Sequence, residues 1–509
     1  MTNLIESEMI ERIWINDRNI VREIRHLVLD CAHFRNLVLM FIHKYKEKYN
    51  KWLTHETLLY PLLSERCNTK RSDETRAKVK EIINSLDDEL RNLLEKIKEQ
   101  KNKINNTVVV QQIIRQIRKD FTSYFRSIKE YKKDPSKFTG EPKPPKPRKL
   151  KNITRFTIEL NRYSYKQDRD KLLIKLRNHL GYNLTVKLSY NYEVTSVRIC
   201  FFHNSVYLDL VRKVKIPKTK PLGEHIAGID LGVDNLVTIV STNPKVDSII
   251  ISGGIFKSFN QWFNKRLAEY RSELDKTLNE IKKYESEDKE VPKELLDKEK
   301  EFRIKINKLC VHRKKKLDSL IHILTSNLAR WLYLTGHSKV YVGKLTTSKQ
   351  NCNMGKINNQ NFYFIPYREI INKLKYKLQL LGVKLLEVDE SYTSKHCPIC
   401  NDHELNRIKR GLVYCEKLIP KSKKKYNKGV VFNADCTGAL NILKKGAKIK
   451  RILNVLTLKS LFRKLCNPVK YMLFEFVSYM KNVVPESSNW RIGDSLKMGK
   501  PRSVTESTG

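Results

Sequence analysis

The chain has 509 residues, 40% of them hydrophobic, and its 100 Lys and Arg against 55 Asp and Glu give a formal charge of +45. This hydrophobic content supports folded cores and excludes a wholly disordered chain. The charge predicts a polyanionic partner, and nucleic acid is the first candidate. No apolar run reaches the roughly 18 residues that a membrane span requires, so we expect no membrane partner.

The N-terminal sequence MTNLIESEMIERIW has acidic residues where a secretory signal would have a basic region and a long apolar core. We therefore expect an intracellular protein, in the cytoplasm or nucleoid, or in the nucleus if the host is eukaryotic. The 10 cysteines are then expected to be thiols or metal ligands rather than disulfides.

Residues 1–135 are expected to be mostly helical, because apolar residues recur there at helical spacing. The clearest segments are Arg22–Lys44, Ser72–Asn102 and Asn106–Tyr131. In the last segment, basic residues are interleaved with aromatic ones. This mixture favours a core face with solvated lysines and a nucleic-acid surface about equally.

The next stretch changes character twice. Prolines at 142, 144, 145 and 147 forbid a helix and favour an extended linker over residues 136–150. From Asn152 to Ile216, short β-branched and aromatic runs such as ITRFTIEL and VTSVRICFF predict closely spaced strands. Strands at this spacing are typical of a small β-barrel.

The stretch His225–Val240, HIAGIDLGVDNLVTIV, predicts a buried strand, a tight turn at Gly232 and a returning antiparallel strand. It carries a single acid, Asp230, inside its first apolar run. A buried carboxylate is costly unless a cation meets it. Asp230 is therefore either a functional acid or an exposed acid at the turn.

Helices and strands alternate after this hairpin, which indicates an α/β layer. The expected elements are helices at Lys265–Tyr284, Pro292–Trp331 and Asn361–Gly382, strands at Ser338–Lys344 and Val383–Glu390, and a helix opening within Gly429–Lys445. The first two helices are expected to form an antiparallel hairpin. Residues 446–509 contain a further basic amphipathic helix and a polar tail.

Acids occur at two further element ends. The strand at Val383–Glu390 exits through Glu387, Asp389 and Glu390, and Asp435 lies where a helix begins in FNADCTGALNIL. Either Asn433 or Asp435 could simply cap that helix. Alternatively, three acids at such ends could hold two Mg²⁺ ions about 3.5–4 Å apart for phosphodiester hydrolysis, because Mg²⁺ prefers carboxylate oxygens.

Between these acids, Cys397-Pro-Ile-Cys400 has the spacing of a zinc half-site. The second half offers Cys415, and Leu418 stands where a fourth cysteine would fall. His403 or His396 could complete the tetrahedron. The alternative is a vestigial knuckle with reduced cysteines.

Three motifs in this order, GIDLGVDNLVTIV, ESYTSKHCPIC and FNADCTGALNI, resemble the transposon-encoded TnpB nucleases and their relatives, the Fanzor proteins and type V CRISPR effectors. The proline-lysine segment followed by strands and the helical hairpin are similar to that family as well. The resemblance covers roughly residues 20–445. It implies a RuvC-like nuclease core of the RNase H fold.

One position departs from most of the family. Gly343 stands where the second RuvC acid is usually found, in KVYVGKLTT. Relatives with a segment like Met354–Pro366, Fanzors among them, also lack that acid and carry a glutamate that matches Glu390. The resemblance therefore implies Asp230, Glu390 and Asp435 as the metal-binding triad. It implies zinc ligands at Cys397, Cys400 and Cys415, with His403 as the fourth.

The resemblance also implies a multidomain α/β and β architecture. Its expected parts are a helical recognition domain at 1–135, which could include an N-terminal part of the wedge, a linker at 136–150, a wedge-like β-barrel at 151–222, a RuvC-like core at 223–395 with a hairpin insertion at 256–334, a zinc-knuckle insertion at 396–428, the third core motif at 429–445, and a basic helix and tail at 446–509. In this family the helical domain and the barrel read a short duplex motif.

The expected function is that of an RNA-guided, Mg²⁺-dependent DNA endonuclease, with a guide RNA and target DNA as partners. Two other functions are also considered. Gly343 favours a nuclease-dead, RNA-guided DNA-binding regulator, against which Glu390 argues. A guide-free nucleic-acid-binding protein is the other alternative, and co-purification with a discrete RNA would exclude it.

Overall fold

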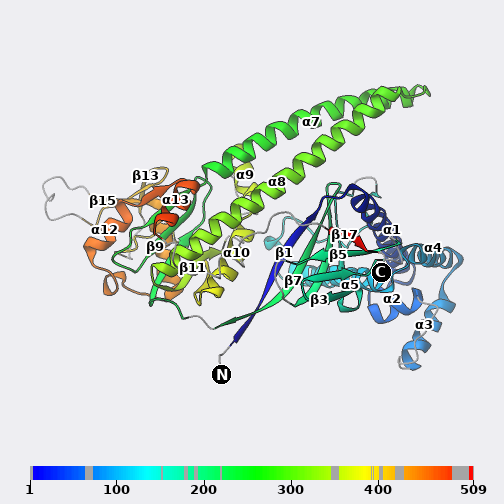
Figure 1. The fold of residues 1–509 in the computed structure, drawn as a ribbon, viewed down its shortest axis with the longest axis horizontal. Helices are drawn as coiled ribbons and strands as arrows, with labels where there is room; N and C mark the ends of the chain where they lie inside the picture. Colours follow the sequence, from blue (N-terminus) through cyan, green and yellow to red (C-terminus); the bar gives the residue numbers. More distant parts are fainter. Residues whose placement is uncertain are drawn as a thin grey trace. The chain divides into compact units, whose positions relative to one another are not determined.

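The computed structural model describes residues 4–63, 73–150, 153–176, 181–188, 193–217, 220–344, 355–390, 393, 395–400, 405–418, 429–483 and 504–507. The chain divides into two compact units. The N-terminal unit contains Glu6–Lys215 and Met498–Gly509, and the C-terminal unit contains Ile216–Lys497 and Met1–Ile5. Figure 1 shows the elements of each unit.

The N-terminal unit has a helical part that matches most of the predicted helices. Its helices are α1 (Arg18–Tyr49), α2 (Glu56–Leu63), α3 (Asp73–Ser85), α4 (Asp88–Ile104) and α5 (Thr107–Lys133), followed by a short 3-10 helix at Pro135–Lys137. The single helix predicted over Ser72–Asn102 is wrong. Asp87 interrupts it, because its side chain accepts a hydrogen bond from Leu90 N and thereby caps a new helix.

The strands of this unit form two sheets, each with four strands. The first sheet has the strand order β1 (Leu4–Ile15), β7 (Ser205–Pro217), β6 (Val194–Phe202) and β2 (Arg155–Leu160). The second sheet has the order β17 (Val504–Ser507), β5 (Asn183–Lys187), β4 (Lys171–Ile174) and β3 (Tyr165–Asp168). A 3-10 helix at Arg162–Ser164 precedes β3. Both sheets and the helices share one hydrophobic core. The predicted closed barrel stays a prediction.

The strand β1 is a part of residues 1–135 that is not helical, within a region predicted to be mostly helical. Met9, Ile13 and Ile15 are buried while Ile10 is exposed. Burial on alternate residues is the pattern of a strand with one covered face. The ion pair between Arg12 and Asp209 of β7 (2.7 Å) lies between these neighbouring strands.

The C-terminal unit is organised around a six-stranded sheet in the order β12-β11-β8-β9-β10-β16. The strands are β8 (His225–Asp230), β9 (Asn235–Ser241), β10 (Ile249–Ser252), β11 (His337–Lys344), β12 (Lys384–Asp389) and β16 (Val469–Tyr471). The strand pairs β8–β9 and β9–β10 are antiparallel, whereas β11 is parallel to both β8 and β12. The predicted hairpin around Asp230 is thus confirmed.

Helices cover both faces of this sheet. They are α7 (Gly254–Ser286), α8 (Lys293–Leu334), α9 (Lys356–Phe364), α10 (Tyr367–Leu380), α11 (Ala434–Ala447), α12 (Leu458–Cys466) and α13 (Leu473–Val483), with a 3-10 helix at Ile452–Asn454. Along β8, Ala227 and Ile229 belong to the core that includes α8 and α10. The residue between them, Gly228, faces α11, because a Cβ there would lie 2.1 Å from Ala439 O.

The helices α7 and α8 lie side by side as the predicted hairpin (Figure 1). The helix predicted over Asn361–Gly382 is instead the pair α9 and α10, because Pro366 cannot continue a helix that begins before it. Among the described residues, no helix has both the length and the apolar character needed to cross a membrane.

A three-stranded antiparallel sheet contains the sequence around Cys415. Its strands are β13 (Asn406–Lys409), β14 (Leu412–Cys415) and β15 (Val430–Asn433). The last strand leads directly into α11, so this small sheet and the main sheet are joined at the start of that helix.

Candidate functional site

The first turn of α11 presents Asp435. Asn433, not Asp435, caps this helix, since the Asn433 side chain accepts hydrogen bonds from the backbone N–H groups of Asp435 (3.0 Å) and Cys436 (3.1 Å). The Asp435 carboxylate is therefore not used as the cap. It accepts instead a hydrogen bond from Asn235 Nδ2 at 2.6 Å.

Asp230 lies at the end of β8 and points toward the same turn of α11. It shares a strand face with Gly228, because side chains two residues apart lie on one side of a sheet. A Cβ placed on Gly438 of α11 would lie 3.0 Å from Asp230 Oδ2. Glycine at 438 thus leaves room for the Asp230 carboxylate beside the helix that carries Asp435.

Glu390 occupies the space that a side chain at position 343 would fill. A Cβ built on Gly343 would lie 1.8 Å from Glu390 Oε1 and 2.4 Å from its Cγ. Gly343 follows Val342, which pairs with Ile229 directly before Asp230. The structure therefore brings Glu390, from the exit of β12, to the strand position next to Asp230.

The acidic centre formed by Asp230, Glu390 and Asp435 is poorly compensated by cations. Burial, reinforced by the charges of Glu390 and Asp435, raises the pKa of Asp230 to about 8. Burial and the neighbouring Asp389 raise the pKa of Glu390 to about 7. Glu390 Oε1 is buried and finds no hydrogen-bond partner among the described residues.

The other two acids at the exit of β12 have cationic partners. Glu387 accepts a 2.6 Å hydrogen bond from Arg368, and Asp389 accepts one of 3.1 Å from Lys445. Paired acids of this kind are satisfied without a metal ion. Among the three candidates, Glu390 alone was placed in the triad by the resemblance, and it is the one that lies beside Gly343.

Sequence reasoning missed two residues of this site. Asn235 holds Asp435, and Tyr367 of α10 donates a hydrogen bond to Gly232 O at 3.0 Å in the turn after Asp230. Both contacts join residues more than 100 positions apart. No local pattern marks either residue as part of the site.

The donor set fits a hard divalent cation. All three side chains of the acidic centre are carboxylates, the ligand type that Mg²⁺ prefers. Such a cation would relieve the repulsion between these carboxylates, and it would give the buried Glu390 oxygen a partner that the described residues do not supply.

The cysteine cluster of Cys397, Cys400 and Cys415 has the geometry of a soft metal site. The three sulfur atoms lie within 4.8 Å of one another, and Cys400 Sγ is 3.8 Å from Cys415 Sγ. Two thiolates on a tetrahedral zinc, with Zn–S bonds of about 2.3 Å, would lie about 3.8 Å apart. Burial and the nearby Cys397 raise the pKa of Cys415 to about 12.

The fourth ligand of this cluster is not settled by the described residues. The predicted ligand His403 lies outside them. His396 is exposed, and its backbone carbonyl accepts a hydrogen bond from Asn441 of α11 at 2.8 Å. Leu418 packs against the hydrophobic cluster around the cysteines. The knuckle is also held to α11 by Lys444, whose Nζ donates to Pro398 O at 2.5 Å.

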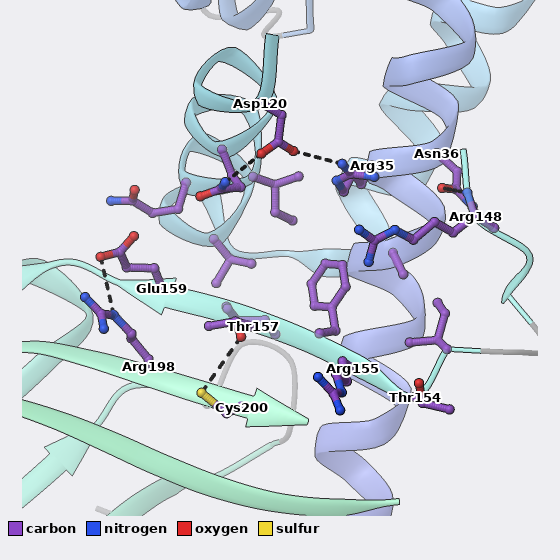
Figure 2. Close-up of a pocket in the computed structure, with 18 of the residues that line it drawn as sticks. Arg35, Asn36, Asp120, Arg148, Thr154, Arg155, Thr157, Glu159, Arg198 and Cys200 are labelled. Carbon is purple, nitrogen blue, oxygen red and sulfur yellow. Dashed lines mark hydrogen bonds and ion pairs between the residues drawn. The ribbon is translucent and has the colours of Figure 1, made fainter. Parts of the chain in front are cut away.

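The N-terminal unit contains a groove of about 870 Å³ between α1, α5 and the strands β2 and β6. Figure 2 shows its walls, with Arg35 on α1 paired to Asp120 on α5 (2.9 Å), and Arg198 near Glu159 (3.8 Å). Asn36 fixes the end of the linker, because its Nδ2 donates to Arg148 O (2.6 Å) and its Oδ1 accepts from Arg148 N (2.9 Å). We call this feature the basic groove.

Cationic side chains outnumber acidic ones in the basic groove. Its cations are Arg35, Lys119, Arg148, Lys149, Arg155 and Arg198, and its acids are Asp120, Glu159 and Asp209. A second hollow, of about 510 Å³, follows α5 and is lined by four basic residues, Arg115, Arg118, Lys119 and Arg126, together with Glu56, Thr122 and Ser123.

Phe121 and Tyr124 of α5 belong to the hydrophobic core of this unit, whereas Phe125 is 38% exposed. Phe121 is fully buried, and the rings of Phe121, Tyr124 and Phe125 all pack around Trp52. Of the two interpretations of this helix, the core explains Phe121 and Tyr124. In the second hollow one acid, Glu56, pairs with Arg115 and Arg118, so the four basic residues there keep an excess of positive charge for a polyanion.

Two family models match the chain. Residues 209–349 match a model described as a probable transposase, and residues 367–442 match the TNB domain of Cas12f1-like proteins. The TnpB-like protein ORF457 of Acidianus two-tailed virus is 31% identical over 232 residues, which cover 45% of this chain and 44% of the relative. The match thus spans less than half the length of that relative.

Among solved structures, similar chains include Cas12f1 in a complex with sgRNA and target DNA, at 19% identity, with a TM-score of 0.30 and coverage of 87% of this chain and 100% of that chain. Another is the mini-RNA-guided endonuclease CRISPR-Cas_phi3, at 11% identity, with a TM-score of 0.32 and coverage of 86% and 92%. Residues 209–349, which hold Asp230, are thus similar to a probable transposase, and residues 367–442, which hold Glu390, Asp435 and the cysteine cluster, are similar to a Cas12f1-like TNB domain. The TnpB-like relative adds a sequence similarity over less than half of the chain.

Proposed function

We propose that the protein is an RNA-guided, divalent-metal-dependent DNA endonuclease whose metal ligands are Asp230, Glu390 and Asp435. The observation that carries this proposal is the Glu390 carboxylate in the space beside Gly343, where one buried oxygen has no partner among the residues that the structure describes. The order and directions of the main sheet support a RuvC-like core of the RNase H fold.

The chain's own residues prepare this centre in distinct ways. The sheet holds Asp230 at a strand end, α11 presents Asp435, and the exit of β12 supplies Glu390. Two divalent ions bound there would activate a water molecule and stabilise the leaving oxygen of a phosphodiester. Because Glu387 and Asp389 are already paired with Arg368 and Lys445, the charge offered to cations is concentrated in the acidic centre.

We propose a structural role for the cysteine cluster, with zinc as the bound metal and His403 as the fourth ligand. The sulfur spacing supports this assignment. A structural zinc would fix the small sheet β13–β15, which leads into α11 and therefore into Asp435.

A guide RNA and target DNA are the proposed partners. The formal charge of +45 and the cation-rich basic groove support nucleic acid in general. The match of residues 367–442 to the Cas12f1-like TNB domain supports an RNA-guided reaction, because Cas12f1 is known in a complex with sgRNA and target DNA.

The proposal is tested by replacing the two acids that the motifs place most firmly. Asp230→Ala and Asp435→Ala should each reduce Mg²⁺-dependent cleavage by at least about 10²–10³-fold, because a ligand of the activating cation is removed. Binding of guide and target should be retained. Cleavage by either variant within about tenfold of wild type would contradict the proposal.

A second candidate is a nuclease-dead, RNA-guided DNA-binding regulator, which Gly343 favours. The two candidates differ in one result. Wild type that binds guide-matched DNA tightly but shows no Mg²⁺- or Mn²⁺-dependent cutting would establish the second.

A further inference from the structure

Asn235, at the start of β9, is the side chain that reaches the Asp435 carboxylate from the main sheet. Its Nδ2 lies 2.6 Å from Asp435 Oδ2, across 200 residues of sequence. The orientation of this amide follows from chemistry, because an ionised carboxylate only accepts hydrogen bonds and the NH₂ end must face it. We propose that Asn235 is a positioning residue that aims the Asp435 carboxylate for metal binding; this inference rests on the proposed function.

The contacts of Asp435 explain why such a residue is needed. The Asn433 side chain caps the helix by accepting hydrogen bonds from the backbone N–H groups of Asp435 and Cys436. This cap fixes the main chain of Asp435 and not its carboxylate. The bond from Asn235 holds one carboxylate oxygen, Oδ2, and leaves Oδ1 for a cation. A partner that orients a metal ligand in this way commonly affects metal affinity strongly.

The neutrality of Asn235 matters as much as its position. A lysine or arginine at this position would compensate the charge of Asp435 and compete with a metal ion. The nearby cations are instead directed to the preceding residue, Asp234, which forms ion pairs with Lys257 and Arg410. The local arrangement therefore orients Asp435 without neutralising it.

The other end of the Asn235 amide also points to a ligand-binding role. Its Oδ1 is buried and has no hydrogen-bond partner among the residues described. A purely structural asparagine normally satisfies both ends of its amide. An amide oxygen that has no partner in the described part of the chain, on a side chain bonded to Asp435, is suited to a water molecule of a hydrated cation.

The test is direct Mn²⁺ binding to the purified chain without nucleic acid, measured by electron paramagnetic resonance. Asn235→Ala should weaken Mn²⁺ binding at the acidic centre by about 10–100-fold. Asn235→Leu keeps a similar volume without a donor and should behave in the same way, so a folding defect of the alanine variant cannot hide the effect.

Asn243→Ala is the matched control. Asn243 lies just beyond the other end of β9, and its amide donates a comparable 3.0 Å bond to Thr335 O, far from the acids. This variant should lose about as much thermal stability as Asn235→Ala while binding Mn²⁺ like wild type.

Two results separate failure of this inference from failure of the proposed function. If wild type binds Mn²⁺, Asp435→Ala weakens that binding and Asn235→Ala does not, the positioning role is overturned and the metal centre stands. If wild type binds no Mn²⁺, or Asp435→Ala leaves its affinity unchanged, the metal centre itself is contradicted and the inference falls with it.

Discussion

The carboxylates in the acidic centre of the C-terminal unit and those in the basic groove of the N-terminal unit differ in their cationic partners. In the groove, Asp120, Glu159 and Asp209 each face an arginine within 4.0 Å. In the acidic centre, Asp230 and Glu390 have raised pKa values, and the buried Glu390 Oε1 lacks a partner in the described part of the chain.

This difference distinguishes acids that support a fold from acids that await a ligand. A paired carboxylate fixes the arginine beside it, and in the basic groove this leaves an excess of positive charge for a polyanion. A buried carboxylate without a cation costs free energy, which a bound metal ion recovers. We therefore expect the groove to govern affinity for nucleic acid and the acidic centre to govern chemistry.

The largest expected effect is on the affinity of the basic groove for nucleic acid. Affinity for nucleic acid should fall by about 10³-fold or more between 50 and 200 mM salt, if about six or more phosphates are neutralised. Arg148→Ala and Lys149→Ala should each lower the slope of log affinity against log salt by about 1. Lys78→Ala, which removes a lysine paired with Glu74 on α3, is the control. An affinity that hardly changes with salt would contradict this prediction.

The next effect concerns the acidic centre. Gly343→Ala would place a methyl group 1.8 Å from Glu390 Oε1, so the carboxylate must leave its position. Cleavage should fall by about 10²-fold or more, while affinity for nucleic acid stays at the wild-type level. Gly140→Ala, at a glycine with no atom within 4 Å of its built Cβ, should cleave like wild type. Full activity of Gly343→Ala would show that Glu390 is not needed in that space.

The cysteine cluster should bind about one zinc per chain. Cys397→Ser should abolish most of this zinc, because it removes one of three thiols that already lie together. Cys466→Ser, at a partly exposed cysteine outside the cluster, should leave the zinc content unchanged. Metal analysis of the purified proteins measures the zinc content per chain. A zinc content that Cys397→Ser leaves unchanged would favour a vestigial knuckle.

The smallest effect is a pH dependence of stability in the metal-free protein. Asp230 and Glu390 have folded-state pKa values of about 8 and 7, above their values of about 4 in an unfolded chain. Between about pH 4 and 8 the folded state therefore binds more protons than the unfolded state, and stability falls as the pH rises. Wild type should lose melting temperature relative to Asp230→Asn over this range, and Mg²⁺ should reverse the loss. A pH-independent difference would argue against the raised pKa of Asp230.

The sequence was most informative where local pattern and function coincide. The hairpin that carries Asp230 has an apolar run, a glycine turn and a β-branched run, which predict strand, turn and strand. The cysteine spacing predicted a cluster, and the sulfurs do lie together. Glu390 was selected by family resemblance, because Glu387, Asp389 and Glu390 are not distinguished by any local pattern.

What escaped sequence reasoning depends on long-range contacts. Glu390 fills the space that a side chain at position 343 would need, although the two residues are far apart in the sequence. The contact of Asn235 with Asp435 likewise joins residues 200 positions apart. The strand β1 was not singled out within residues 1–135, which were predicted to be mostly helical. Its pairing beside β7 decides in favour of a strand.

The most direct test compares two glutamates of the same β12 exit. Glu390→Gln keeps the shape and removes the charge of the unpaired acid, whereas Glu387→Gln does the same to the acid paired with Arg368. With its own guide and target, Glu390→Gln should cleave as poorly as Asp230→Ala, and Glu387→Gln should stay within about tenfold of wild type. Wild-type cleavage by Glu390→Gln, or loss of cleavage in Glu387→Gln alone, would contradict the assignment of Glu390 as the second catalytic acid.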